Sequence, residues 1–100
     1  MKNGYKIEWT DNALSELKLT FEYIENNWTG KELRKLSQEI ERTINLISNN
    51  PNIFPITESH NVRKAVVKKL NTMYHRETIE RKIEILSFFS NRQNPNKRKI

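Results

Sequence analysis

The stretch KIEILSFF, residues 82–89, is rich in β-branched and aromatic side chains, and it stops at the turn-forming stretch SNRQNP, residues 90–95. A run of this length and composition, bounded in this way, predicts a β-strand. Arg92 follows just beyond the end of this strand, and we expect it to lie beside a second basic segment at residues 62–69. Positive charge and aromatic surface are therefore concentrated in the second half of the chain.

Two further strands are predicted upstream of this one. Residues 62–67 and 72–76 have a period of two, with turns expected at residues 69–71 and 78–80. Three consecutive strands joined by short turns form an antiparallel meander. Residues 5–9 alternate in the same way and predict an N-terminal strand that pairs along an edge of the sheet.

Two helices are predicted between the first strand and the meander. Thr10 can accept a hydrogen bond from the first turn, and Asp11 complements the positive end of the helix dipole. Gly30 is expected to end or interrupt this first helix, and Pro51 stops the second. Both helices carry an apolar stripe at spacings of three and four: Leu14, Leu17, Phe21, Ile24 and Trp28, then Leu33, Leu36, Ile40, Ile44 and Ile47.

The predicted fold class is α+β, with the element order β-α-α-β-β-β. An antiparallel helical hairpin packs on one face of a twisted antiparallel sheet of about four strands, with the N-terminal strand at an edge. A chain of 100 residues forms one domain, here residues 1–100. Residues 51–61 are expected to be an ordered connector, and residues 94–100 a loosely ordered basic tail.

The charge of the chain is unevenly distributed. Residues 62–100 hold eleven Lys or Arg and three Glu, a net of +8, whereas residues 1–61 hold seven basic and nine acidic side chains, a net of −2. Such asymmetry concerns partners more than fold, and it points to RNA, DNA or an acidic protein segment. The alternative is that the basic stretch at residues 96–99 is only a solvated tail.

Composition excludes several other classes of protein. The absence of cysteine excludes a disulfide scaffold and thiolate chemistry, and no apolar run reaches the length of a membrane span. His60 and His75 share no ligand spacing, so no metal site is expected, and two glycines do not form a phosphate loop. We expect a soluble, cytoplasmic protein without cofactors.

The remaining chemistry is that of a metal-free ribonuclease, in which basic and aromatic side chains act on a phosphate. Strand alternation separates the candidates: Tyr74 points opposite to His75, and Lys64 and Lys68 share a face that excludes Arg63. Parity leaves open which of these groups faces out. The candidate side chains are Arg63, Lys64, Lys68, Tyr74, His75, Arg76 and Arg92.

Over residues 5–97 the chain resembles the RelE/ParE toxin superfamily. The order of elements agrees, and so do several local features in sequence. These are IEWT at 7–10 followed by Ala13 and Leu17, the pair Tyr23 and Ile24, NP at 50–51 with FP at 54–55, VRKAVV at 62–67, Tyr74, and the closing stretch 83–95.

The resemblance implies the toxin of a type II toxin–antitoxin pair used in plasmid stabilisation. Such a toxin is neutralised by a cognate antitoxin whose C-terminal segment wraps the sheet and helices, and the antitoxin makes most of the DNA contacts. RelE-like members cut messenger RNA on the ribosome, whereas ParE-like members inhibit DNA gyrase. An acidic antitoxin segment would neutralise the basic half, so the complex should weaken with salt.

Departures from the RelE pattern favour the ParE-like branch. Asn71 stands where those ribonucleases keep an arginine, Val62 stands in place of a lysine, and no Tyr or His-Tyr acid follows Arg92. Loss of a phosphate clamp and a proton donor removes transition-state stabilisation. The alternatives are a ribosome-dependent endoribonuclease and a degenerate toxin that only binds antitoxin.

Site residues are assigned under both readings. For a ribonuclease, the catalytic candidates are Arg92, Lys64 and His75, although His75 and Tyr74 can also be read as a surface histidine and a core tyrosine. Target or antitoxin binding is assigned to Arg63, Lys64, Lys68, Arg76, Arg92 and Trp28.

Overall fold

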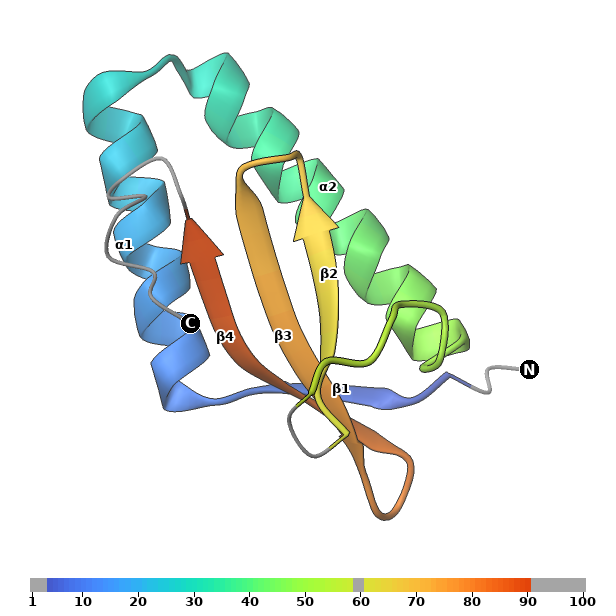
Figure 1. Cartoon of the computed structure of the whole chain (residues 1–100). Coiled ribbons are helices and arrows are strands. Elements are labelled where there is room, and N and C mark those ends of the chain that lie inside the picture. Colours follow the sequence, from blue (N-terminus) through green and yellow to red (C-terminus); the bar gives the residue numbers. More distant parts are fainter. Residues whose placement is uncertain (1–3, 59–60, 91–100) are drawn as a thin grey trace.

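The computed structural model describes residues 4–58 and 61–90 (Figure 1). Its elements follow the predicted order, and the α+β fold class is confirmed. Their bounds are β1 Lys6–Trp9, α1 Asp11–Asn27, α2 Gly30–Asn49, β2 Arg63–Val67, β3 Asn71–Thr78 and β4 Lys82–Ser90. Figure 1 shows α2 crossing behind the strands and α1 running alongside β4.

The four strands form one sheet in the order β1-β4-β3-β2. β2, β3 and β4 are the predicted antiparallel meander, and β1 occupies an edge as expected. β1, however, runs parallel to β4, so the sheet is mixed and not antiparallel throughout. The helical hairpin carries the chain across the sheet to β2, and a meander of three strands then brings β4 back in the direction of β1.

One irregularity interrupts the pairing of β3 with β4. His75 lies opposite Ile85 and Tyr74 lies opposite Ser87, so Leu86 is an extra residue in β4. Such a bulge shifts the alternation of side chains by one position. Ile83 and Ile85 are therefore buried before it, and Phe88 is buried after it.

Threonine caps begin both helices. The Thr10 side chain accepts a hydrogen bond from the Ala13 amide at 3.1 Å, as the sequence predicts. Thr29 accepts one from the Glu32 amide, and Gly30 is the first residue of α2. The expectation that Gly30 ends the first helix is wrong, because α1 has already ended at Asn27.

The core lies between the helical hairpin and the sheet. Leu14 and Trp28, expected on the apolar stripe of α1, are each 48% exposed. Small side chains at Ala13 and Thr20 occupy the buried face of α1 instead. The core residues are Ala13, Ile24, Leu36, Ile40, Ile47, Val67, Met73, Ile83, Ile85 and Phe88.

Both turns of the meander place non-glycine residues in the left-handed region. Lys68 and Lys69 have φ angles of 51° and 67°, and Glu80 and Arg81 have φ angles of 66° and 57°. Paired positive φ angles are the geometry of tight hairpin turns, which favour Asn and Gly. These two turns are therefore strained.

Within the described part of the chain, no helix is long and apolar enough to cross a membrane. The same residues contain no group of three or more His, Cys, Asp or Glu side chains that could hold a metal ion.

Candidate functional site

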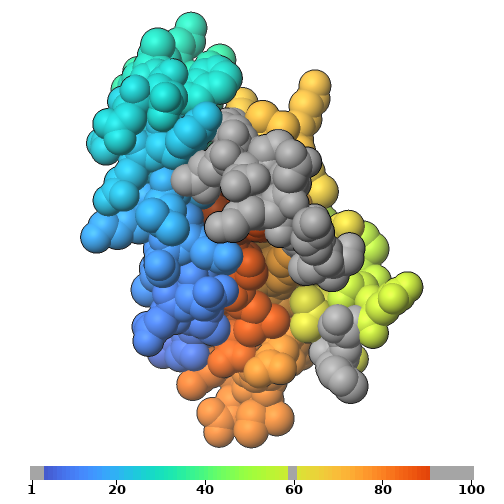
Figure 2. Space-filling view, turned by 60° about the vertical axis from the view of Figure 1, so that its left-hand side comes forward, coloured from blue at the N-terminus to red at the C-terminus, as the bar shows by residue number. Residues whose placement is uncertain are grey.

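The meander buries one face and leaves the other facing away from the core. Figure 2 shows β4 and β3, in red to orange, between α1 in blue and the connector in yellow-green. We call the face of the meander that points away from the core the open face. Its residues alternate with the buried ones along the strands: Lys64 and Val66 of β2, Thr72, Tyr74 and Arg76 of β3, and Glu84, Ser87 and Phe89 of β4.

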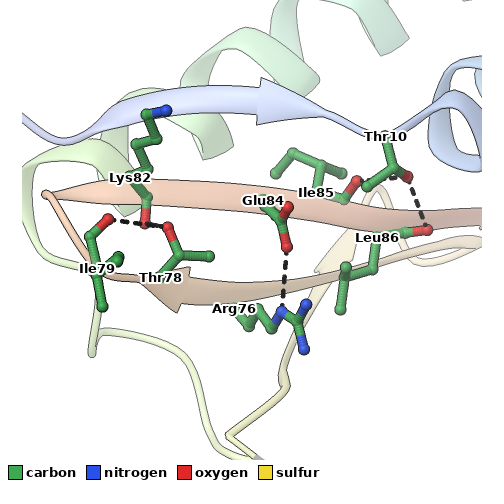
Figure 3. Close-up of polar contacts among 8 residues, drawn as sticks. All are labelled: Thr10, Arg76, Thr78, Ile79, Lys82, Glu84, Ile85 and Leu86. Atoms are coloured by element: carbon green, nitrogen blue, oxygen red, sulfur yellow. Dashed lines mark hydrogen bonds and ion pairs between the residues drawn. The ribbon is translucent and has the colours of Figure 1, made fainter.

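Two cations lie on the open face in different electrostatic states. Arg76 Nε donates to Glu84 Oε1 at 3.1 Å across β3 and β4 (Figure 3). Lys64 lies opposite Tyr74, two residues before Arg76 on β3, and it is exposed. Among the described residues no carboxylate pairs with Lys64, so its charge is directed at solvent or a partner.

The outer edge of β2 is only half covered. The Lys64 amide donates to the Pro55 carbonyl at 3.1 Å, and the Thr57 amide donates to the Val62 carbonyl at 2.7 Å. Because backbone groups alternate in direction along an antiparallel strand, the N–H and C=O of Val66 face the same outer edge as those of Lys64. No backbone hydrogen bond within residues 4–58 and 61–90 reaches Val66 from that side.

Basic and apolar side chains surround this uncovered part of the edge. Val66 is 57% exposed, and Leu70 is also exposed. Lys68 and Lys69 form the strained turn that follows β2. In the described structure neither lysine takes part in an ion pair. The edge therefore offers unpaired backbone groups in a basic setting, and we call residues 64–70 the β2 edge.

Arg63 and His75 lie on the opposite, core-facing side of the strands. Arg63 Nη1 donates to the Phe54 carbonyl at 2.7 Å, and the His75 ring meets the Phe54 ring edge-on with centroids 6.2 Å apart. His75 is 1% exposed, so the expectation of a surface histidine is wrong. Together these contacts hold the connector against the sheet.

The pKa of His75 is lowered from 6.5 to about 4. Burial is the main cause because it disfavours the charged ring, and the nearby positive charge of Arg63 adds to it. His75 Nε2 has no hydrogen-bond partner among the described residues. The ring is therefore neutral at physiological pH.

The predicted site residues are only partly brought together. Lys64 and Arg76 share the open face, Lys68 lies at the end of β2, and Arg63 and His75 point the other way. Trp28 lies at the end of α1 and is half exposed. Arg92 and residues 94–100 lie outside the described residues.

Sequence reasoning missed several residues of this region. The sequence places Val66 in a strand without indicating a role, and Ser87 and Phe89 reach the open face because of the bulge at Leu86. The alternation of Lys64 and Val66 with buried Ala65 and Val67 was the available signal for Val66. No residue in β4 marks the bulge.

A concave surface runs along the outer side of α2. It has a volume of about 470 Å³ and is open to solvent. Leu46 and Ile53 are the apolar side chains in it, and its other lining residues are Gln38, Glu41, Arg42, Asn45, Asn49 and Asn50. This mixture of amides and opposite charges carries no evident catalytic group.

Comparison with known proteins gives a structural match and no sequence match. No family model and no curated protein matches the chain. One similar solved structure is described as "Chromosomal ParDE TA system from P. aeruginosa". The matched chain is 16% identical, the alignment covers 89% of this chain and 98% of that one, and the TM-score is 0.70. The two proteins therefore share a fold over nearly their whole length.

Proposed function

We propose that the protein is the toxin of a type II toxin–antitoxin system that acts in the bacterial cytoplasm. The observation that carries this proposal is the fold shared over 89% of the chain with a protein from a ParDE system. The basic second half and the uncovered β2 edge add support, because both suit a protein that is bound by an acidic partner.

The proposed partner is a cognate antitoxin, and we place its acidic segment along the β2 edge. An extended segment there can pair with the backbone of Val66, as in strand addition to an exposed sheet edge. Acidic side chains on it would meet Lys64, Lys68 and Lys69. The resemblance to the RelE/ParE superfamily further implies that the antitoxin makes most of the contacts with operator DNA.

The proposed target is DNA gyrase, which the toxin would inhibit by binding. Two features of the site favour binding over cleavage. His75 lies on the opposite side of the sheet from Lys64, and Asn71, at the position of the RelE-type arginine, is buried and donates to the Val67 carbonyl at 2.9 Å. Neither residue is placed to act on a phosphate at the open face.

A second candidate function is ribosome-dependent cleavage of messenger RNA. It is favoured by the common orientation of Lys64, Tyr74 and Arg76 on the open face. Under this reading Lys64 and Arg92 would contact the scissile phosphate. The pairing of Arg76 with Glu84 reduces what Arg76 offers to an anion.

Induced expression in a bacterial host without antitoxin distinguishes these functions. Transcript ends are sequenced while a reporter follows DNA damage. We expect growth arrest with damage signalling and intact transcripts. Ribosome-phased transcript ends would replace gyrase with the ribosome as the target, and the absence of any growth effect would leave only an antitoxin-binding module.

Variants of the open face sharpen the same experiment. Lys64→Ala should weaken toxicity, whereas Lys35→Ala, an exposed lysine on α2, is the matched control and should not. If transcripts are cleaved, Lys64→Ala should reduce cleavage by about 100-fold or more, the usual size of a catalytic contact to the reacting phosphate. Equal toxicity of Lys64→Ala and Lys35→Ala would remove the open face from the proposal.

A further inference from the structure

The outer edge of β4 beyond β1 is another place where the sheet could pair with another chain. Its first half is covered by β1, which pairs in parallel from Lys6 opposite Lys82 to Trp9 opposite Ile85. Beyond β1 the chain turns into α1, and the Thr10 amide donates to the Ile85 carbonyl at 3.0 Å. From Leu86 onward no strand lies against this edge in the described structure.

Where β1 ends, side chains at the start of α1 form hydrogen bonds with the outer edge of β4. Thr10 Oγ1 donates to the carbonyls of Ile85 and Leu86, two neighbouring groups that reach the same edge at the bulge (Figure 3). Asn12 Nδ2 also donates to the Leu86 carbonyl, at 3.0 Å. The first two backbone acceptors beyond β1, the carbonyls of Ile85 and Leu86, are therefore occupied by side chains from the cap and first turn of the helix.

Glu16, one turn further along α1, accepts hydrogen bonds from two donors of β4. Its Oε1 accepts from the Phe88 amide at 2.9 Å and from Ser87 Oγ at 2.7 Å. A carboxylate bound by two donors at these distances makes strong, charge-assisted hydrogen bonds. Thr10, Asn12 and Glu16 thus occupy three backbone groups that a neighbouring strand would otherwise pair with: the carbonyls of Ile85 and Leu86 and the amide of Phe88.

The segment that they cover is prone to association. Residues 85–90, ILSFFS, contain no charge and no proline, and they are rich in residues that favour strands. An exposed edge of this composition is a template for pairing with an identical segment. The β2 edge differs, because the lysines at 64, 68 and 69 would repel a second copy.

We infer that α1 and its cap serve as a strand surrogate that closes the outer edge of β4, and that Glu16 is the residue that prevents this edge from pairing with a second copy of the chain. The occupant of an opened edge is β4 of another molecule, since the uncharged segment 85–90 can pair with itself in antiparallel register. This inference does not depend on the proposed function.

The test uses Glu16→Ala, with Glu22→Ala as the matched control from an exposed position of the same helix. Residue-resolved hydrogen exchange reports on the Phe88 amide, and sedimentation over a series of concentrations reports on association. We expect exchange at Phe88 to accelerate at least about tenfold in Glu16→Ala, because the amide loses its acceptor. We also expect its mass to rise with concentration, and Glu22→Ala to match the wild type in both measurements.

Two further variants decide between edge pairing and general loosening. Glu16→Gln keeps an acceptor oxygen in place and should stay close to the wild type. Adding Ser87→Lys to Glu16→Ala places a charge on the opened edge, so it should abolish association while exchange at Phe88 remains fast. Association that persists in this double variant would overturn the inference.

Loss of folding in Glu16→Ala can be recognised by near-UV circular dichroism. In that event Asn12→Ala takes its place. It removes the hydrogen bonds that Asn12 Nδ2 donates to the Leu86 carbonyl and to Glu16 Oε1 but leaves Glu16 itself in place, so it should produce a smaller rise in association. If Glu16→Ala or its replacement is indistinguishable from Glu22→Ala in exchange and in mass, the edge is not closed in this way and the inference is wrong.

Discussion

The outer sides of β4 and β2 present the same kinds of backbone groups and are covered in opposite ways. The edge of β4 is covered along its first half by β1 and then by side chains of Thr10, Asn12 and Glu16. The edge of β2 is covered by the connector only as far as Lys64, and the backbone of Val66 is uncovered among the described residues. The outer side of β4 is thus largely covered, whereas that of β2 is uncovered at Val66 and basic. This difference suits β2 to pairing with a partner.

The largest expected effect comes from moving a proline by one residue in β2. Val67→Pro removes an amide from the ladder with β3 and should destabilise the fold by about 3 kcal/mol or more. Val66→Pro removes an amide that faces outward, so it should change stability by less than about 1 kcal/mol. Urea unfolding of the two variants measures the difference.

The same pair of variants tests partner binding. Val66→Pro should reduce affinity for the proposed antitoxin at least about tenfold, because strand addition needs that amide. Isothermal titration with the folded variant measures this directly. Equal destabilisation by both prolines would show that the Val66 amide is not directed outward.

Acid should loosen the connector that covers the outer side of β2 at Val62 and Lys64. The pKa of His75 is about 4 in the folded protein and 6.5 when the ring is free, so the unfolded chain takes up the proton first. Stability is therefore fully present above pH 6.5, and it falls as the pH drops towards 4, by up to about 3 kcal/mol.

Urea unfolding at a series of pH values measures this effect, with His75→Leu as the comparison. The variant carries no titrating ring, so the part of the pH dependence between 6.5 and 4 that comes from His75 should disappear. An unchanged slope in His75→Leu would mean that burial of this ring does not control the acid response.

Charge at the β2 edge should affect the rate of partner binding more than the fold. Replacing Lys68 and Lys69 with Glu should slow association with an acidic antitoxin by about tenfold at low salt, with the difference shrinking as salt is added. Stopped-flow kinetics at several salt concentrations provide the measurement. The matched control is the replacement of Lys31 and Lys35, exposed on α2, with Glu.

The smallest expected effect concerns the strained turns. Lys69→Gly and Glu80→Gly each relieve a positive φ angle, and each should stabilise the fold by about 0.5–1 kcal/mol. Thermal unfolding measures the gain. If Lys69 does not contact the proposed antitoxin, both variants should bind it equally. If Lys69 does contact it, only Lys69→Gly should bind more weakly.

Much of the fold could be predicted from the sequence because the local signals were strong. The Thr10 cap, the apolar spacing of both helices, and the alternation in residues 5–9 and in the last three strands identified every element. The parallel direction of β1 was not predictable, since it depends on how the helical hairpin crosses the sheet. The prediction that Gly30 ends the first helix fails because α1 ends at Asn27 and Thr29 caps a new helix that begins at Gly30.

The site was less predictable because parity leaves the buried face undetermined. Val66 and Lys64 share a face, and the sequence did not say that this face is the open one. Burial of Ala65 and Val67 resolves the question and places His75 inside. The contact of Glu16 with Phe88 joins residues 72 positions apart, which no local pattern reveals.

Residue-resolved hydrogen exchange of the free protein and of its complex with the proposed antitoxin tests the central claim most directly. In the free protein we predict slow exchange at Phe88 and fast exchange at Val66. In the complex Val66 should become protected, while Phe88 should not change. Fast exchange at Phe88 in the free protein, or a Val66 amide that the antitoxin leaves unprotected, would contradict the contrast between a closed and an open edge.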